Sequence, residues 1–160
     1  MKKPSIGIIA VGNPLRKDDG IGLILLDYLQ KDSSHFSEFV SFIDGGTGGL
    51  NLLYLMNRYD RIVFLDAVDF QGQPGESRFF SLDEIKSQKH VSSVSTHNED
   101  LFQIIRLGKE LNECPNDIFV FGVQPANVSF GKGLTKELQK KLDSIFYALK
   151  KELKNVIEDQ

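Results

Sequence analysis

The chain has 160 residues, the size of one domain, and we expect a single domain over residues 1–160. Hydrophobic residues make up 41% and charged residues 26%, which argues against disorder, and no apolar run approaches the ~20 residues of a membrane-spanning helix. The net charge of −3 argues against a nucleic-acid partner, and the single cysteine excludes an internal disulfide and a thiolate zinc site.

The first apolar run, Ile6–Val11, follows a short basic stretch and so resembles part of a signal peptide. Asn13 and Pro14 stand where a small-residue cleavage site would be, so we interpret the run as a buried first strand. Because the chain shows no targeting signal and no paired cysteines, we expect a cytoplasmic protein.

Further short apolar runs, rich in β-branched and aromatic residues, predict strands that are buried on both faces. One segment is more polar, and we predict an edge strand there. The predicted strands are Ile6–Val11, Phe39–Ile43, Arg61–Leu65, Ser77–Ser81 (the edge strand) and Asp117–Val123.

Apolar residues at spacings of three and four predict helices over residues 21–29, 50–57, 101–111 and 134–157. The last helix has a lysine-rich side, which we interpret as solvated, with a nucleic-acid or membrane surface as the alternative. Strands alternating with helices predict a single-domain three-layer α/β/α fold. We expect a mostly parallel twisted sheet of five strands, in which one edge strand can run antiparallel.

In such a sheet, ligands bind at the loops after the carboxyl ends of the strands. Acidic residues follow three predicted strands: Asp18 and Asp19 after the first, Asp44 after the second, and Asp66 and Asp69 after the third. His97 lies at the start of a later predicted helix. The sequence therefore places carboxylates and an imidazole at one edge of the sheet.

Some of these residues have a structural alternative. Asp18 or Asp19 could cap the first helix, and Thr96 with Glu99 matches a capping box around His97. Asp66 ends a buried run, where a carboxylate needs a partner.

Two carboxylates and one imidazole from three loops make an O,O,N ligand set that leaves positions open for water or substrate. We predict Asp19, Asp66 and His97 as this set, with Asp18 and Asp69 as the neighbours that could replace a member.

The loop Gly45–Gly49 could bind a phosphate through its backbone N–H groups, or it could let a substrate backbone approach closely. The chain lacks a dinucleotide-binding pattern, a P-loop and a Gly-x-Ser-x-Gly elbow, so nucleotide binding and a serine nucleophile are not expected. Cys114 is expected on the side opposite the predicted site.

The order of these motifs resembles the hydrogenase maturation endopeptidases, which process the large subunit of nickel–iron hydrogenases. The resemblance runs from about Ile6 to the final predicted helix and rests on shared order and spacing. The segments that carry it are Gly12-Asn13, Asp18-Asp19-Gly20-x-Gly22, Asp44-Gly45-Gly46-Thr47, Asp66-Ala67, Ser95-Thr96-His97, Gly122-Val123-Gln124-Pro125 and Gly131-x-Gly133-Leu134-Thr135.

The resemblance implies an aspartyl-type or metal-dependent endopeptidase that cuts near the C-terminus of its substrate in a nickel-dependent way. The family's metal contacts fall on Asp19, Asp66 and His97. Some members carry glutamate where this chain has the shorter Asp19, so the choice between Asp18 and Asp19 stays open.

The implied partner is the precursor of a nickel–iron hydrogenase large subunit, which would bring the nickel itself, and other divalent metals could substitute in vitro. Substrate would bind at Asn13, Gly45, Gly46 and Thr47. We expect a monomer with no nucleic-acid or membrane partner, and we expect the choice of hydrogenase to depend on exposed loops.

Two rival functions remain. Gly12-Asn13-Pro14 also resembles the start of peptidyl-tRNA hydrolases, but those carry a histidine soon after this loop, where this chain has Asp18 and Asp19. The other rival is a non-catalytic, nickel-sensing chaperone for the same hydrogenase, which would bind the precursor without shortening it.

Overall fold

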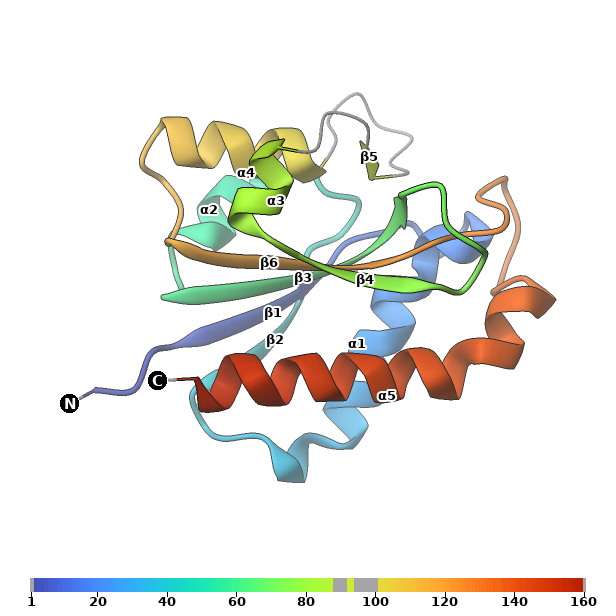
Figure 1. The fold of residues 1–160 in the computed structure, drawn as a ribbon, viewed down its shortest axis with the longest axis horizontal. Coiled ribbons are helices and arrows are strands. Elements are labelled where there is room, and N and C mark those ends of the chain that lie inside the picture. Colours follow the sequence, from blue (N-terminus) through green and yellow to red (C-terminus); the bar gives the residue numbers. More distant parts are fainter. Residues whose placement is uncertain (1, 88–91, 94–100, 160) are drawn as a thin grey trace.

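The computed structural model describes residues 2–87, 92–93 and 101–159. Its centre is a twisted sheet whose strands follow the spatial order β2-β1-β3-β6-β4, with the short β5 paired to the far end of β3 (Figure 1). The strands are β1 (Ile6–Ala10), β2 (Val40–Asp44), β3 (Arg61–Asp69), β4 (Ser77–Ser81), β5 (Ser92–Ser93) and β6 (Asp117–Val123).

Strands β2, β1, β3 and β6 are parallel, and β4 is an antiparallel edge strand beside β6. The predicted fold class is therefore confirmed, including the edge strand over Ser77–Ser81. The chain passes from β1 to β2 on one side and then crosses to β3 on the other side of β1. This reversal of strand order creates the crevice where ligands bind in open α/β sheets.

Helices cover both faces of the sheet (Figure 1). α1 (Ile21–Lys31) and α5 (Lys136–Glu158) pack on one face, and α2 (Asn51–Met56), α3 (Leu82–Ser87) and α4 (Leu101–Glu110) pack on the other. Side chains of a strand alternate between the two cores: Ile8 packs with α1 and α5, whereas Ile9 packs with α2 and α4. Burial of such side chains supplies about 1.5–3 kcal/mol each, so both cores hold the strand ends in place.

The structure differs from the predicted elements mainly in β3, which continues four residues beyond Leu65 to Asp69. The extension is stable because Asp66 and Ala67 pair with Gly122 and Val123 of β6, while Val68 pairs with β5. Asp66 therefore lies inside a strand and not in the loop after it.

Three short helices were not predicted: the 3-10 turns η1 (Lys17–Gly20) and η2 (Ser33–His35), and α3. Cys114 lies just before β6, at the amino end of the parallel strands, as expected. The lysines of α5 lie on its exposed side, in agreement with a solvated face. Within the described part of the chain, no helix has the length and apolarity needed to cross a bilayer.

Candidate active site

Buried polar side chains gather at one end of the sheet. In the described residues, the buried charged or amide side chains are Asp18, Asp19, Asp66 and Gln124, each at most 8% exposed. Asp18 and Asp19 follow β1, Asp66 lies in the second half of β3, and Gln124 directly follows β6. Because these strands are parallel, all four side chains lie at their carboxyl ends, where the sequence predicted a site.

Close backbone contacts bring the loop after β1 against β3. Val11 N donates a hydrogen bond to Leu65 O at 2.9 Å, directly beside Asp66. A Cβ atom on Gly22 would lie 2.4 Å from the same Leu65 oxygen, and one on Gly12 would lie 2.1 Å from the backbone oxygen of Asp19. Only glycine fits at these two positions, so the glycines around the aspartates let η1 and α1 pack onto the strand ends.

Asp19 is 4% exposed and lies in η1, which contacts β3. Its Oδ2 atom accepts a hydrogen bond from Asn13 N at 2.9 Å. Asn13 Oδ1 in turn accepts one from Leu15 N at 2.9 Å, so the loop closes on itself around the carboxylate. Asn13, predicted to bind substrate, thus uses its side-chain oxygen and its backbone N–H to shape this loop.

Asp18 has a different environment from its neighbour. Its Oδ2 atom accepts hydrogen bonds from Ala126 N at 2.9 Å and Asn127 N at 3.1 Å. Its Oδ1 atom accepts one from Thr135 N at 2.8 Å, and the Thr135 hydroxyl reaches both oxygens. Asp18 therefore ties the loop before α5 to η1, and these bonds favour Asp19 as the ligand of the pair.

The helix-capping alternative for these aspartates is wrong for α1. The N-cap residue of that helix is Gly20, and no side chain caps it. Asp18 instead lies at the start of α5, where it bonds to the N-cap residue Thr135. A carboxylate is favourable there because the helix start carries a partial positive charge.

Asp66 is 3% exposed and lies on the face of β3 that holds Phe64 and Val68, toward α2 and α4. Asp69, its predicted substitute, is three residues along the strand and therefore on the opposite face. It is exposed and accepts hydrogen bonds from Gln71 N at 3.0 Å and from Gln124 Nε2 at 3.2 Å. This placement favours Asp66 over Asp69.

His97 and the surrounding Thr96–Glu99 pattern lie outside the described residues. Its place beside Asp19 and Asp66 stays a prediction. In the residues that the structure does describe, no group of three His, Cys, Asp or Glu side chains is arranged to hold a metal ion.

The glycine loop after β2 lies against the loop after β1. Gly45 N donates to Ala10 O at 2.7 Å, Gly46 N donates to the Asp44 carboxylate at 2.8 Å, and Gly46 O accepts from Gly12 N at 2.9 Å. Gly46 has a φ of +65°, a conformation that glycine adopts without strain. The N–H groups of Gly45 and Gly46 are therefore already donated within the protein, and Thr47, which follows them, is exposed.

Gln124 is a buried residue of this region that the sequence did not single out as a site residue. Its Oε1 atom accepts hydrogen bonds from Phe70 N at 2.9 Å and Gly72 N at 3.1 Å, and its Nε2 atom reaches Asp69. It thereby fixes the chain after β3. The available signal was an amide directly after the apolar run Asp117–Val123 and before Pro125.

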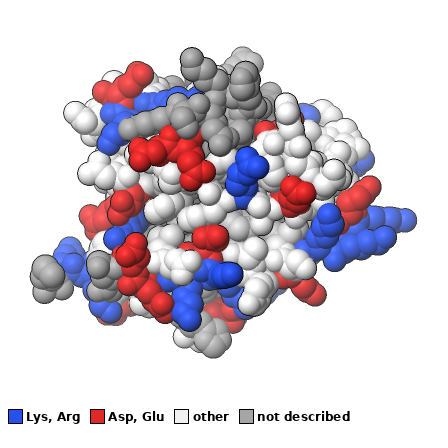
Figure 2. Space-filling view, viewed as in Figure 1, with Lys and Arg blue, Asp and Glu red and all other residues white. Residues whose placement is uncertain are grey.

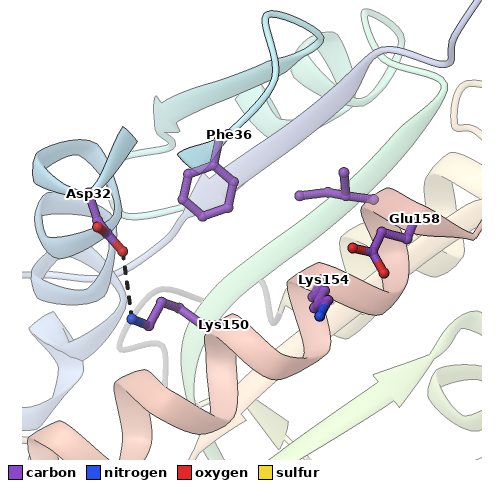
Figure 3. Close-up of a pocket in the computed structure, with 6 residues that line it drawn as sticks. Asp32, Phe36, Lys150, Lys154 and Glu158 are labelled. Atoms are coloured by element: carbon purple, nitrogen blue, oxygen red, sulfur yellow. Dashed lines mark ion pairs between the residues drawn. The ribbon is translucent and has the colours of Figure 1, made fainter. Parts of the chain in front are cut away.

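A cavity of about 450 Å³ lies elsewhere, between the end of α1 and the C-terminal half of α5 (Figure 3). Phe36 lines it, and Lys150 forms an ion pair with Asp32 across it at 3.6 Å. Because α5 starts near the carboxyl ends of the strands and runs back, this cavity lies toward their amino ends. It contains none of the predicted site residues.

A family model described as hydrogenase maturation protease matches residues 25–152 of the chain. This range contains Asp66, the loop Gly45–Thr47 and His97, and it begins after Asn13 and Asp19. The family model, which covers more than half of the chain, does not favour the peptidyl-tRNA hydrolase or chaperone alternatives.

Curated relatives agree with this match. The chain is 29% identical over 142 residues to the hydrogenase expression/formation protein HupD of Thiocapsa roseopersicina, covering 87% of this chain and 63% of that one. It is 30% identical over 161 residues to a Methanocaldococcus jannaschii protein provisionally named a hydrogenase maturation protease, covering 96% and 99%. The chain spans only 61% and 63% of the length of the HupD proteins of Rhizobium leguminosarum and Thiocapsa roseopersicina.

Among solved structures, the chain resembles the hydrogenase maturating endopeptidase HybD from E. coli, with a TM-score of 0.73 at 22% identity over 95% of this chain and 93% of that one. At this identity the likeness establishes the shared fold. The family model and the M. jannaschii relative go further, and they show that the chain belongs to the hydrogenase maturation protease family.

Proposed function

We propose that this protein is an endopeptidase that removes a C-terminal peptide from the precursor of a nickel–iron hydrogenase large subunit after nickel insertion. Membership of the family supports cleavage of a peptide bond. The observation that carries the proposal is the burial of Asp19 and Asp66 at the carboxyl ends of the neighbouring strands β1 and β3. Buried carboxylates are costly, and this crevice is where α/β sheets bind ligands.

Nickel is part of the substrate in this proposal. The precursor holds it through its own cysteine thiolates, and Asp19, Asp66 and His97 add oxygen and nitrogen ligands from the protease. A histidine and two carboxylates can complete a divalent metal site while leaving room for the other chain's ligands. Other divalent metals could take the place of nickel in vitro, because carboxylate and imidazole ligands bind several of them.

The bound metal would polarise the scissile carbonyl or activate a water. Water adds to the carbonyl carbon, the C–N bond breaks, and the released amine takes up a proton. A carboxylate that is not bound to the metal would accept the proton from the attacking water and pass it to the amine. Both carboxylates lie in the protein interior, where the dielectric is low, so their attraction to the positive charge of the metal would be stronger than in water.

The loops beside these aspartates would hold the substrate backbone. Gly45 and Gly46 present no side chains, so an extended peptide can lie close to the chain. The N–H groups of Gly45 and Gly46 are already donated to Ala10 and Asp44. Direct hydrogen bonds to the substrate would therefore come from the exposed Thr47 and from the side-chain nitrogen Nδ2 of Asn13.

We further propose that the protein acts as a cytoplasmic monomer that needs neither nucleic acid nor a membrane. The acidic net charge of −3 supports a protein partner over nucleic acid. A sedimentation measurement at the 18.0 kDa of one chain would support the monomer, and a stable dimer would contradict it.

The test compares nickel-loaded and nickel-free precursor. Each is incubated with the protein, and the mass of the large subunit is measured. We expect shortening of the nickel-loaded precursor alone. Equal cleavage of both forms would exclude nickel sensing, and nickel-dependent binding without a mass change would favour the non-catalytic chaperone. A parallel assay with peptidyl-tRNA is expected to give no hydrolysis.

Variants assign the roles of the residues. Asp19→Asn, Asp66→Asn and His97→Ala are each expected to lower the rate of cleavage strongly, by about 10²-fold or more. Asp143→Asn, on the exposed side of α5, is the matched control and is expected to cleave normally. Full activity of His97→Ala would remove that histidine from the ligand set.

A further inference from the structure

Two loops at the carboxyl end of the sheet lie side by side: the one after β1 and the one between β6 and α5 (Figure 1). Gly131 N donates a hydrogen bond to Leu15 O at 2.9 Å, and Lys17 N donates one to Gly131 O at 3.0 Å. Arg16 Nε donates to Val128 O at 2.9 Å. Together with the hydrogen bonds of Asp18, these contacts fix the two loops against each other, although they are more than a hundred residues apart in the chain. The two loops therefore form one continuous surface.

Two large apolar side chains project from this surface into solvent. Phe130 is 77% exposed and Leu15 is 56% exposed. Each comes from one of the two paired loops, and the backbone bonds described above bring them to the same side of the molecule. Apolar side chains grouped on a fixed backbone are typical of a surface that binds another protein.

The same surface is basic. The Arg16 guanidinium lies 4.9 Å from the centroid of the Phe130 ring, and Lys17 and Lys132 come from the same two loops. Residues 12–17 and 124–135 contain no Asp or Glu, and the Asp18 carboxylate between them is buried, although the whole chain has a net charge of −3. Figure 2 shows basic side chains at the edge where Figure 1 places the start of α5.

A cavity of about 290 Å³ opens beside these loops, between them and the first half of α1. Pro14, Leu23 and Ile24 give it apolar walls, and Lys17 lines it as well. Its acidic residue, Asp27, forms an ion pair with Lys31 at 2.7 Å. The cavity can therefore accept an apolar side chain from a peptide that lies across the surface.

We infer that Leu15, Arg16, Lys17, Phe130 and Lys132, here called the Leu15–Phe130 surface, bind an extended segment of the hydrogenase precursor outside the scissile bond. This inference rests on the proposed function. The segment would carry an apolar side chain that packs on Leu15 and Phe130, and an Asp or Glu that pairs with the three cations. The position of this surface next to Asp19, where the proposed function places the precursor, favours a precursor segment over a second copy of this chain.

This role concerns binding and not the chemical step. The Leu15–Phe130 surface is held by backbone hydrogen bonds, so little conformational entropy is lost when a peptide binds. Loss of one of its side chains should therefore raise KM and leave kcat unchanged, because the carboxylates at the reaction centre are untouched.

The experiment measures KM and kcat of the full chain on nickel-loaded precursor. Phe130→Ala is compared with Tyr147→Ala, because Tyr147 on α5 is 71% exposed, and Leu15→Ala is compared with Leu111→Ala, which is 53% exposed. We expect Phe130→Ala and Leu15→Ala each to raise KM about tenfold with kcat unchanged, as for residues at the centre of an interface. The two control variants should behave as wild type.

The charge component has its own pair of variants. Lys132→Glu is compared with Lys140→Glu, because both lysines are exposed and only the first belongs to the Leu15–Phe130 surface. Lys132→Glu should raise KM and weaken its dependence on salt, whereas Lys140→Glu should change neither.

Several results would overturn the inference: an unchanged KM in both Phe130→Ala and Leu15→Ala, an equal rise in the control variants, or a fall in kcat alone. A change in sedimentation of Phe130→Ala would instead assign the surface to self-association. The proposed function fails separately, if wild-type protein does not shorten the precursor. In that case, precursor binding to Phe130→Ala, measured without cleavage, still decides whether this surface docks it.

Discussion

Charged side chains are buried at one end of the parallel sheet and lie at the surface at the other end. At the carboxyl end, Asp18, Asp19 and Asp66 are at most 4% exposed. At the amino end, charged groups pair at the surface: Arg61 Nε lies 3.0 Å from the Asp117 carboxylate, whose side chain is 50% exposed. Surface pairs of this kind contribute little to stability, whereas a buried carboxylate requires hydrogen bonds or ligands to offset its lost hydration.

This difference indicates what each end is for. A chain that only needed to fold could have placed apolar residues at the buried positions of η1 and β3. Retaining carboxylates there is understandable for Asp18, which joins two loops, and for Asp19 and Asp66, which we propose to contact the metal of the substrate. Substitutions at the carboxyl end should therefore have large and separable effects, and those at the amino end should have small ones.

The largest effect is expected from Asp66→Asn. The amide keeps the shape of the side chain but loses the charge that binds metal or accepts a proton, so we expect the rate of precursor cleavage to fall by about 10²–10⁴-fold. The free energy of unfolding should change by no more than about 1 kcal/mol, because the neutral amide is less costly to bury. Mass spectrometry of the precursor and urea unfolding measure the two quantities.

Asp117→Asn is the matched control for this substitution at the amino end of β6. It breaks an exposed ion pair with Arg61 and should leave cleavage unchanged. If Asp66→Asn loses activity only because it loses stability, Asp66 has a structural role. The two ends of the sheet would then differ in burial of charge but not in function.

A large loss of stability is expected from Asp18→Ala. The substitution leaves three backbone N–H groups without their acceptor, those of Ala126, Asn127 and Thr135. We expect the free energy of unfolding to fall by about 2–4 kcal/mol, read from the midpoint of urea unfolding. Asp18→Asn, which keeps one acceptor oxygen, should lose less.

Cleavage by Asp18→Ala, measured where the variant is still folded, should decline less than cleavage by Asp66→Asn. An Asp18→Ala protein as stable as wild type would mean that the hydrogen bonds of this carboxylate do not hold the loop before α5. An Asp18→Ala protein that is stable but inactive would make Asp18 the metal ligand in place of Asp19.

The contrast between Asp18 and Asp19 shows where sequence reasoning ends. Both follow the same predicted strand, and nothing local distinguishes them. The partners of Asp18 lie 108 to 117 residues away in the chain, so its role depends on the tertiary fold. By contrast, Asp66 was identifiable from the sequence, because a carboxylate at the end of a buried apolar run always needs an explanation.

The fold was predictable for a similar reason. Continuous apolar runs and helical periodicity report burial directly, and they predicted β1, β2, β3, β6, the antiparallel edge strand β4 and the four main helices, but not the two-residue strand β5. The extension of β3 to Asp69 was not predictable, because it depends on pairing with β6 and β5. The 3-10 turns η1 and η2 were missed because three or four residues are too few to display a period. The six-residue helix α3, which directly follows β4, was also missed.

Gly22→Ala is expected to have a moderate effect. The added Cβ would lie 2.4 Å from Leu65 O, a backbone atom that cannot move without shifting β3 beside Asp66. Overpacking of this kind costs about 1–3 kcal/mol of unfolding free energy, measured by urea unfolding. Cleavage should also fall, because α1 and η1 are pushed away from the strand.

Gln30→Ala is the control on the same helix, since Gln30 is exposed and alanine is a strong helix former. It should be as stable as wild type. If Gly22→Ala were equally stable, the tight packing of α1 on β3 would not be what positions the loop after β1.

The smallest effect is expected at the amino end, at Asp60. Hydrogen bonds from the Ser5 backbone N–H at 2.8 Å and the Ser5 hydroxyl at 2.9 Å lower the pKa of Asp60 below its usual value. Because the pKa is lower in the folded protein, the stabilisation is present above the unfolded pKa of about 3.9 and is lost as the pH falls through the folded pKa.

Asp60→Asn should therefore reduce the free energy of unfolding at neutral pH by less than about 1 kcal/mol, because solvent screens this exposed carboxylate. The difference from wild type should shrink when urea unfolding is repeated below about pH 4. A deficit that is equal at both pH values would show that the charge of Asp60 contributes nothing. A deficit as large as that of Asp18→Ala would contradict the comparison itself, because an exposed carboxylate would then stabilise the protein as much as a buried one.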